Sequence, residues 1–381
     1  MKRFGRKLLR SFVILAAAVL VVHANGAFAA ASMEYYVSEV DGSEQPYGLY
    51  IPEPFHPDVP HPVVFYAHGR TARAEADFPD YISYAGKMLN YHRRSYADEK
   101  GWILVNLDGR GDTRYQGIGE NDFFRVLDEL RAMYNIDENR IYLTGASMGA
   151  VGAFRLGFRH PDVFAAVSGT DGAWNYRWYH DAWYASAADP GRIEPSREPL
   201  LQSGSAVDIA ENGMHLGMHM IVDTNDGNVS PEENGRALDA RLTELGYPHS
   251  YNEKPGIHVE GYDCLEIYDF FSKHVKDPNP KHVVLKANEL KYGSAYWVQI
   301  DRLEKNPAAD IFATVEARID GEAGTVEVTV SNLLEYTLFL TPELVGTDEV
   351  SIYTNDHLSY AGPVGEITVF ASVDESETIV G

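Results

Sequence analysis

The sequence predicts an α/β fold with a doubly wound, mostly parallel sheet, followed by a small all-β, sandwich-like C-terminal domain. Three observations predict this arrangement. Short apolar runs alternate with segments of helical period through the first two thirds of the chain. A serine between two glycines stands where a strand-like run meets a helix-like run. After residue 281 the pattern changes to short segments of period two.

Composition narrows the class of protein. The chain has 381 residues, with 32 Lys and Arg against 56 Asp and Glu, which gives a net charge of −24. Such an acidic balance argues against nucleic acid as a partner, because nucleic-acid binding needs a basic surface. Hydrophobic residues make up 45 % and aromatic residues 12 %, enough to build a core and too many for a disordered chain.

The first 29 residues have the pattern of a signal peptide. A positively charged start precedes a short apolar run over 12–22, and Ala27-Phe28-Ala29 fits the small-x-small cleavage rule. The apolar run is shorter than the ~20 residues of a membrane-spanning helix. We therefore expect a secreted or periplasmic protein, with no membrane span after cleavage.

The segment 30–276 is predicted to form the α/β domain. Continuous apolar runs of this kind are typical of strands in a parallel sheet that is covered on both faces. Helical spacing of apolar residues appears between them, over 123–133 and 237–245. The strand-like runs lie at 35–40, 47–51, 62–66, 102–107, 141–144, 164–167 and 219–222.

A turn-rich linker with two prolines, 277–280, separates this part from the C-terminal domain, 281–381. The alternation of apolar and polar residues is clearest over 325–330, where three valines share one face of a strand. About a hundred residues of short strands predict a small antiparallel sandwich. Its strands are expected at 282–285, 295–300, 311–317, 325–330, 338–340, 350–353 and 367–371.

The most informative segment is 141–149, in which a β-branched and aromatic strand leads into Gly145-Ala-Ser147-Met-Gly149. A helix-like segment, 150–159, follows at once. A serine on a sharp strand-to-helix turn needs small neighbours, and the two glycines supply them. The adjacent helix N-terminus favours the anion that develops in acyl transfer. This context predicts that Ser147 is a nucleophile and that 30–276 is a catalytic domain.

A nucleophilic serine needs a base and an orienting acid, which follow in the order Ser, Asp or Glu, His in this type of fold. Asp226 follows a strand end and precedes a helix, and Asp223 is its competitor. His258 lies in Pro255-Gly-Ile-His258, before a helix expected from about residue 262. It is expected to take the serine proton and return it to the leaving group.

Two backbone amides are expected to form the oxyanion hole: that of Met148, after the nucleophile, and that of Arg70, in the loop after the run 62–66.

No cofactor and no metal is predicted. His215 and His219 have a metal-like spacing, but the glycines around them argue against a helix. Cys264, the only cysteine, is interpreted as a packed apolar residue.

Together these segments resemble the α/β-hydrolases of the prolyl-oligopeptidase-like and polyhydroxybutyrate-depolymerase- or feruloyl-esterase-like group. The resemblance runs from about residue 62 to 275, and it implies an α/β-hydrolase fold with Asp226 as the acid. Val222-Asp223 stands where the group has His-Gly, which leaves an extra carboxylate near the site. The motifs are YAHGR (66–70), GRGD…YQGIGEND (109–122), YNIDENRIYLTGASMGA (134–150), RHPDVFAAVSG (159–169), TNDGNVSP (224–231) and PGIH (255–258).

The insertion 170–218 is rich in aromatic residues. In this topology it can fold over the nucleophile as a lid, and Trp174, Trp178 and Trp183 are the predicted substrate-binding residues for an aromatic acyl group or a sugar ring. The alternative is that these rings pack the insertion as a small core of its own.

The favoured interpretation is a secreted serine hydrolase that cleaves carboxylic esters through an acyl-enzyme. The resemblance to feruloyl esterases and depolymerases implies aromatic or polymeric esters as candidate substrates. Only about thirty mature residues precede the hydrolase core, too few for the β-propeller that gates oligopeptidases. A prolyl-oligopeptidase-type serine peptidase remains the first alternative. The second is a surface- or polysaccharide-binding protein with a hydrolase-like fold. The oligomeric state is left open.

Overall fold

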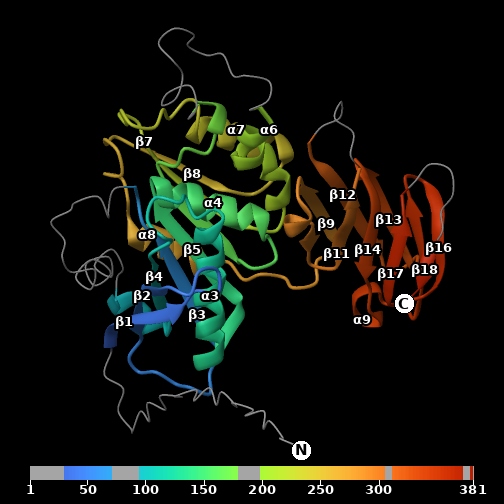
Figure 1. Ribbon diagram of the computed structural model, residues 1–381, viewed down its shortest axis with the longest axis horizontal. Helices are drawn as coiled ribbons and strands as arrows, with labels where there is room; N and C mark the ends of the chain where they lie inside the picture. Colours follow the sequence, from blue (N-terminus) through green and yellow to red (C-terminus); the bar gives the residue numbers. More distant parts are fainter. Residues whose placement is uncertain (1–29, 71–93, 179–197, 305–310, 372–377, 381) are drawn as a thin grey trace, which may run out of the picture.

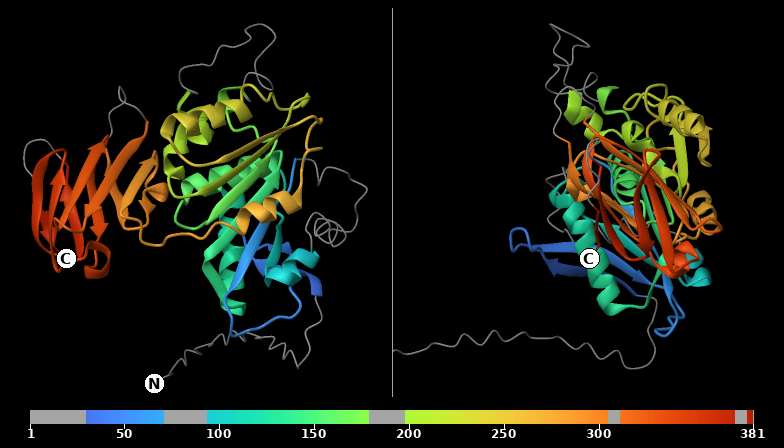
Figure 2. Two further views of the ribbon diagram at one scale, coloured as in Figure 1. Left: turned by 180° about the vertical axis from the view of Figure 1, so that it is seen from behind. Right: turned by 90° about the vertical axis from the view of Figure 1, so that its right-hand side faces the viewer.

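The computed structural model describes residues 30–70, 94–178, 198–304, 311–371 and 378–380. The signal-peptide prediction, 1–29, lies outside these residues. Within them, a large α/β unit carries two smaller β-sheets beside it, and the C-terminal strands lie on the far side from β1 and β2 (Figures 1 and 2).

The larger sheet has eight strands in the order β1-β2-β4-β3-β5-β6-β7-β8. β1 and β2 pair antiparallel, β2 joins β4 antiparallel, and all other neighbours from β4 to β8 run parallel. This confirms the predicted mostly parallel, doubly wound sheet. The strands are β1 (Ala30–Val37), β2 (Glu44–Ile51), β3 (His61–Ala67), β4 (Ile103–Leu107), β5 (Ile136–Ala146), β6 (Ala166–Thr170), β7 (Gly217–Asp223) and β8 (Ser250–Lys254).

Helices cover both faces of this sheet because its strands are apolar on both sides. On β3, Val63 and Phe65 join one buried cluster with the apolar stripes of α3 (Ile118–Met133), α4 (Met148–Arg159) and α7 (Gly235–Leu245). Val64, between them, joins a second cluster with α2 (Arg94–Lys100) and α8 (Cys264–Phe271) on the opposite face. Successive strand residues point to opposite faces, so one strand supplies both cores.

The two smaller sheets each have five strands and enclose a separate core. Their orders are β10-β11-β14-β17-β18 and β16-β15-β13-β12-β9. The elements are β9 (His282–Ala287), η3 (Leu290–Tyr292), β10 (Ser294–Ala295), β11 (Val298–Leu303), β12 (Ala313–Asp320), β13 (Thr325–Ser331), β14 (Leu333–Phe339), α9 (Pro342–Val345), β15 (Glu349–Thr354), β16 (His357–Pro363), β17 (Glu366–Phe370) and β18 (Thr378–Val380).

The observed strands differ from those expected here in four details. β13 and β15 pair parallel, so the sandwich is not antiparallel throughout. The segment expected at 338–340 is the end of β14, which begins at Leu333. Neither β16 nor β18 was predicted. β16 is a partly exposed edge strand that ends in Gly362-Pro363, and edge strands tolerate such residues.

Buried polar contacts join the two units. The Tyr292 hydroxyl donates to Glu120 Oε2 at 2.8 Å, and the Arg159 guanidinium lies 4.2 Å from the centre of the Tyr292 ring. Arg159 also donates to Asn288 Oδ1 at 2.7 Å, and Asn212 accepts from the Lys286 amide at 2.7 Å. Arg159 is 1 % exposed, so the C-terminal sheets cover the end of α4.

The insertion 170–218 is described in two parts, on either side of 179–197. Its second part contains α6 (Glu198–Gly204) and η2 (Val207–Gly213). Arg177, from the first part, donates to Glu198 at 2.7 Å and to Asp208 at 2.6 Å and so ties the two parts together. Among the described helices, none combines the length and the hydropathy needed to cross a bilayer.

Candidate active site

Ser147 lies on a strained turn between β5 and α4. Its backbone has φ 54° and ψ −117°, a conformation that non-glycine residues rarely adopt. The Ser147 amide donates to the Thr170 carbonyl of β6 at 2.8 Å, and its carbonyl accepts from Val151 at 3.2 Å. These bonds fix the turn from both sides, so the hydroxyl is presented at the carboxyl edge of the sheet.

The two flanking glycines are required by close packing of backbone on backbone. A Cβ on Gly149 would lie 1.9 Å from the Ala67 carbonyl oxygen of β3. A Cβ on Gly145 would lie 2.4 Å from the Gly149 carbonyl carbon and 2.8 Å from the same Ala67 oxygen. α4 therefore starts directly against β3, which is possible only without side chains at these positions.

The structure brings Ser147, His258 and Asp226 together, although 111 and 32 residues separate the bonded pairs. His258 Nε2 lies 2.8 Å from Ser147 Oγ, and His258 Nδ1 lies 2.7 Å from Asp226 Oδ2. The three residues come from the segments that follow β5, β8 and β7, at one edge of the parallel sheet. Asp226 Oδ1 accepts from the amides of Asn228 and Val229 at 2.7 and 3.1 Å, which fixes the carboxylate.

Electrostatics in this cluster favour a charged acid and a basic imidazole. Burial alone would raise the pKa of Asp226, but hydrogen bonds from His258 and from two backbone amides outweigh it and lower that pKa. Burial alone would lower the pKa of His258, but its bond to Asp226 and the charges of Asp226, Asp171 and Asp223 raise it above 6.5.

Asp223, the alternative acid, is not bonded to His258. It is fully buried at the end of β7, where Oδ2 accepts from the Gly261 amide at 2.9 Å.

His215 and His219 bind separate partners: His215 Nε2 lies 2.5 Å from the His282 carbonyl, and His219 Nδ1 lies 3.0 Å from Ser168 Oγ. Cys264 is the partly exposed first residue of α8.

The two predicted oxyanion donors belong to two different segments near the nucleophile. Met148 is the first residue of α4 and is buried, and Arg70 is exposed in the segment after β3. Gly69 brings this segment to the turn, because a Cβ there would lie 3.6 Å from Ser147 Cβ. His68 anchors the segment, since its Nε2 lies 2.7 Å from the Asp108 carbonyl.

The three tryptophans predicted to bind substrate have different positions. The prediction for Trp174 is wrong: its side chain is 1 % exposed, packs 5.1 Å from the Phe154 ring and donates to the Ala150 carbonyl at 3.1 Å. It is a core residue, in line with the packing alternative. Trp178 is half-buried beside a small cluster with Val151 and Val229, and Trp183 lies outside the described residues.

Asp171 was missed by the sequence reasoning. It is the first residue after β6 and is 2 % exposed, and its carboxylate lies beside Asp226 and His258. One signal pointed to it: an acidic residue directly after a buried strand of a parallel sheet falls at the same edge as the nucleophile.

Possible ligand atoms of Asp171, Asp226 and His258 lie within 4.8 Å of one another, a spacing that also suits a metal ion. Each of these side chains already makes hydrogen bonds within the protein. Both Asp171 oxygens accept from backbone amides, and Asp226 and His258 bond to each other. The set therefore fits an acid–base cluster better than a cation site.

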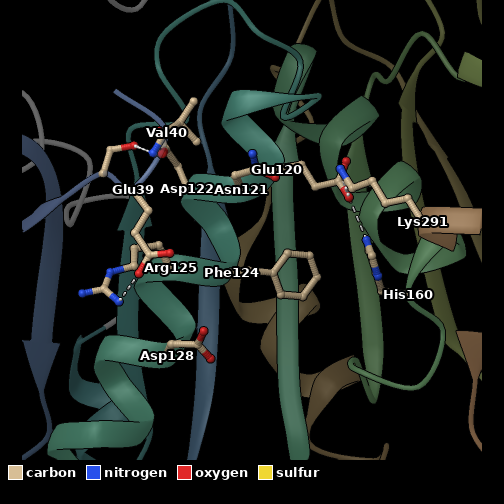
Figure 3. A pocket seen from close by; sticks show the side chains of 11 residues that line it. Glu39, Val40, Glu120, Asn121, Asp122, Phe124, Arg125, Asp128, His160 and Lys291 are labelled. Atoms are coloured by element: carbon tan, nitrogen blue, oxygen red, sulfur yellow. Dashed lines mark hydrogen bonds and ion pairs between the residues drawn. The ribbon is translucent and has the colours of Figure 1, made fainter. Parts of the chain in front are cut away.

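A separate pocket of about 320 Å³ lies at the other end of α4 (Figure 3). One of its lining residues, His160, follows α4, whereas Ser147 precedes this helix, so His160 lies about 20 Å from the nucleophile at 1.5 Å per residue. Lys291 of the C-terminal part reaches into it and lies 3.1 Å from Glu120, while His160 lies 2.9 Å from the same carboxylate.

Comparison with known proteins finds hydrolases that are similar to this chain. Residues 87–255 match the prolyl oligopeptidase family. A feruloyl esterase B of Talaromyces funiculosus is 30 % identical over 115 residues, which are 27 % of this chain and 31 % of that protein. The chain thus matches about a third of this curated relative's length.

Two solved structures share the fold. The fluorophosphonate-binding serine hydrolase F of Staphylococcus aureus superposes with a TM-score of 0.50 at 15 % identity, over 64 % of this chain and 98 % of that one. A putative dipeptidyl aminopeptidase IV of Bacteroides ovatus gives 0.50 at 18 % identity, over 64 % of this chain and 36 % of that one. These matches confirm the predicted α/β-hydrolase fold.

Proposed function

We propose that this chain is a serine hydrolase that cleaves carboxylic esters through Ser147, His258 and Asp226. One observation carries the proposal: an unbroken chain of two hydrogen bonds, 2.8 and 2.7 Å long, links the serine on the strained turn to a buried carboxylate. This is the arrangement that a serine needs to become a nucleophile.

The reaction follows from the positions of the three groups. Ser147 Oγ attacks the ester carbonyl carbon while His258 Nε2 takes the hydroxyl proton, and Asp226 stabilises the imidazolium. The amides of Met148 and Arg70 are the proposed donors to the oxyanion. The C–O bond then breaks, and His258 gives its proton to the departing alcohol. Water attacks the acyl-enzyme in the same way, which releases the acid and restores Ser147.

Two features support an ester as the substrate. The matched relative of similar sequence is a feruloyl esterase, and the half-buried Trp178 lies next to Val151, one turn after the nucleophile. An aromatic acyl group is therefore the proposed substrate class. The match of 87–255 to the prolyl oligopeptidase family supports a second candidate, a peptidase with the same three residues.

The two candidates separate in a direct turnover assay. p-Nitrophenyl acetate, methyl ferulate and a prolyl p-nitroanilide are offered to the wild type and to Ser147→Ala. Hydrolysis of the esters but not the anilide, abolished in the variant, supports the esterase. Anilide turnover supports the peptidase. Ester hydrolysis that persists in Ser147→Ala refutes the proposed nucleophile.

We also propose that the protein is exported and that residues 1–29 are removed. The charged start, the short apolar run and the Ala27-Phe28-Ala29 site support this. The mature protein then begins at Ala30, at the start of β1. Mass spectrometry of the intact exported protein tests this proposal. A mass that still includes residues 1–29 contradicts it.

A further inference from the structure

The backbone around His258 is held in an unusual conformation. His258 lies in the segment 255–263 between β8 and α8, and the next residue, Val259, has φ +67°. This region is costly for a β-branched side chain, so the surroundings must impose it. The orientation of the imidazole depends on this backbone, because the ring is attached one residue away.

Asp171 is the group that holds Val259. Its Oδ2 accepts from the Val259 amide at 2.6 Å, and its Oδ1 accepts from the Asp223 amide of β7 at 2.8 Å. The side chain is 2 % exposed and starts at the end of β6. One carboxylate thus joins the histidine segment to two neighbouring strands of the sheet, β6 and β7.

Asp223 holds the same segment at a second point. Its Oδ2 accepts from the Gly261 amide at 2.9 Å, and the residue is fully buried. The segment packs directly on this carboxyl, since a Cβ on Gly256 or Gly261 would lie 2.4 or 2.6 Å from Asp223 Oδ1. That oxygen has no hydrogen-bond partner among the described residues.

We propose that Asp171 and Asp223 are a pair of positioning residues, which fix the backbone on the C-terminal side of His258 and so aim its imidazole at Ser147. The proposal rests on the proposed function, because it assigns the pair a role in that reaction. Neither carboxyl is bonded to Ser147 or to the imidazole, so the pair acts through the segment and not on the substrate.

The charge of the pair agrees with this role. Burial raises the pKa of Asp171, and the nearby Asp223 carboxyl raises it further, although two backbone amides oppose this. Both carboxyls also favour the protonated imidazole, because their charges raise the pKa of His258.

Other charged side chains near the pair have partners of their own, and Glu260, on the histidine segment, accepts from the Ile257 amide at 2.9 Å. Asp226 is bonded to His258 at 2.7 Å. Lys254, at the end of β8, donates to the Gly261 carbonyl at 3.0 Å and to Glu266 at 2.6 Å, so its charge is balanced by Glu266.

The first test is Asp171→Asn, which keeps the shape but removes one of two acceptor oxygens. The expected result is a 10- to 100-fold fall in kcat for p-nitrophenyl acetate with KM within twofold of wild type. The matched control, Asp263→Asn, changes the cap of α8 on the same segment and is expected to keep wild-type kcat, because Asn is also a good cap. An unchanged kcat in Asp171→Asn overturns the proposal.

A rescue separates positioning from a general loss of folding. Glycine adopts positive φ without strain, so Val259→Gly in the Asp171→Asn background is expected to raise kcat at least threefold. A double variant as slow as Asp171→Asn overturns a role through the Val259 backbone. If Asp171→Asn does not fold, Asp223→Asn takes its place, because it weakens the bond to the Gly261 amide of the same segment. Asp223→Asn is then compared with Asp223→Asn/Val259→Gly.

A pH profile tests the effect of the two carboxyls on His258. Their charges raise the pKa of His258, so the acid limb of kcat/KM is expected to move to lower pH in Asp171→Asn/Asp223→Asn. An acid limb that stays at its wild-type pH in this double variant overturns the electrostatic part of the role. Fluorophosphonate labelling of the wild type comes first, since a wild type that neither labels nor turns over ester refutes the proposed function instead.

Discussion

Gly149→Ala is the substitution that most sharply tests how the nucleophile is positioned. The added Cβ would lie 1.9 Å from the Ala67 carbonyl oxygen, 2.6 Å from the Ala67 carbonyl carbon and 2.9 Å from the His68 carbonyl oxygen. All three contacts are to backbone, so no side chain can rotate away. Real Cβ contacts stay above 3.0 Å, so the start of α4 must move away from β3 by about 1 Å.

This movement changes the distance between Ser147 Oγ and His258 Nε2, which is 2.8 Å. A misplacement of about 1 Å costs on the order of 10²-fold in rate, and overpacking of this kind costs about 1–3 kcal/mol of stability. We therefore expect kcat for p-nitrophenyl acetate to fall about 100-fold and the Tm to fall by several degrees.

The control is Gly365→Ala, in the loop between β16 and β17, where an added Cβ meets nothing within 4 Å. Its kcat and Tm are expected to match the wild type. Steady-state kinetics and calorimetry on the three proteins decide the matter. Wild-type kcat in Gly149→Ala refutes the reasoning that this packing sets the position of Ser147.

Three further predictions concern charge. Asp226→Asn is expected to lower kcat about 10⁴-fold, because it removes the acceptor that orients His258; steady-state kinetics measure it, and a loss below tenfold contradicts the role. Because the pKa of His258 is raised, activity is lost as the pH falls, and the acid limb of kcat/KM is expected to have its midpoint above 6.5; a lower midpoint contradicts the raised pKa. Burial opposes ionisation of Glu120, but bonds from His160, Tyr292 and Lys291 lower its pKa from 4.5 to about 2. Ionised Glu120 therefore contributes about 3 kcal/mol of stability that is present above pH 4.5 and lost as the pH falls toward 2; Glu120→Gln is expected to remove this part of the pH dependence of urea unfolding.

The α/β part could be predicted from sequence because its signals are local. Strands such as 62–66 are apolar on both faces, and Gly145-Ala-Ser147-Met-Gly149 needs only the strand before it and the helix after it. Asp226 and His258 were found by chain order and resemblance, and the structure places both within hydrogen-bond distance of their partners. These signals do not depend on contacts between distant parts of the chain.

The predictions that failed concern contacts between distant parts of the chain. Trp174 follows the same aromatic pattern as Trp178, but the sequence does not show that Phe154 and Ala150 of α4 enclose it. Asp171 was missed because its role depends on Val259, 88 residues later. The parallel pairing of β13 with β15 is likewise a long-range choice that alternation alone does not encode.

The central claim is that Ser147 is an activated nucleophile. It is tested most directly by fluorophosphonate labelling of the mature protein, with peptide mapping by mass spectrometry and with Ser147→Ala and His258→Ala in parallel. The account predicts one adduct, on Ser147, with none on the Ser147→Ala protein and much slower labelling of His258→Ala. An adduct on another residue, or no adduct on a folded wild-type protein, would contradict it.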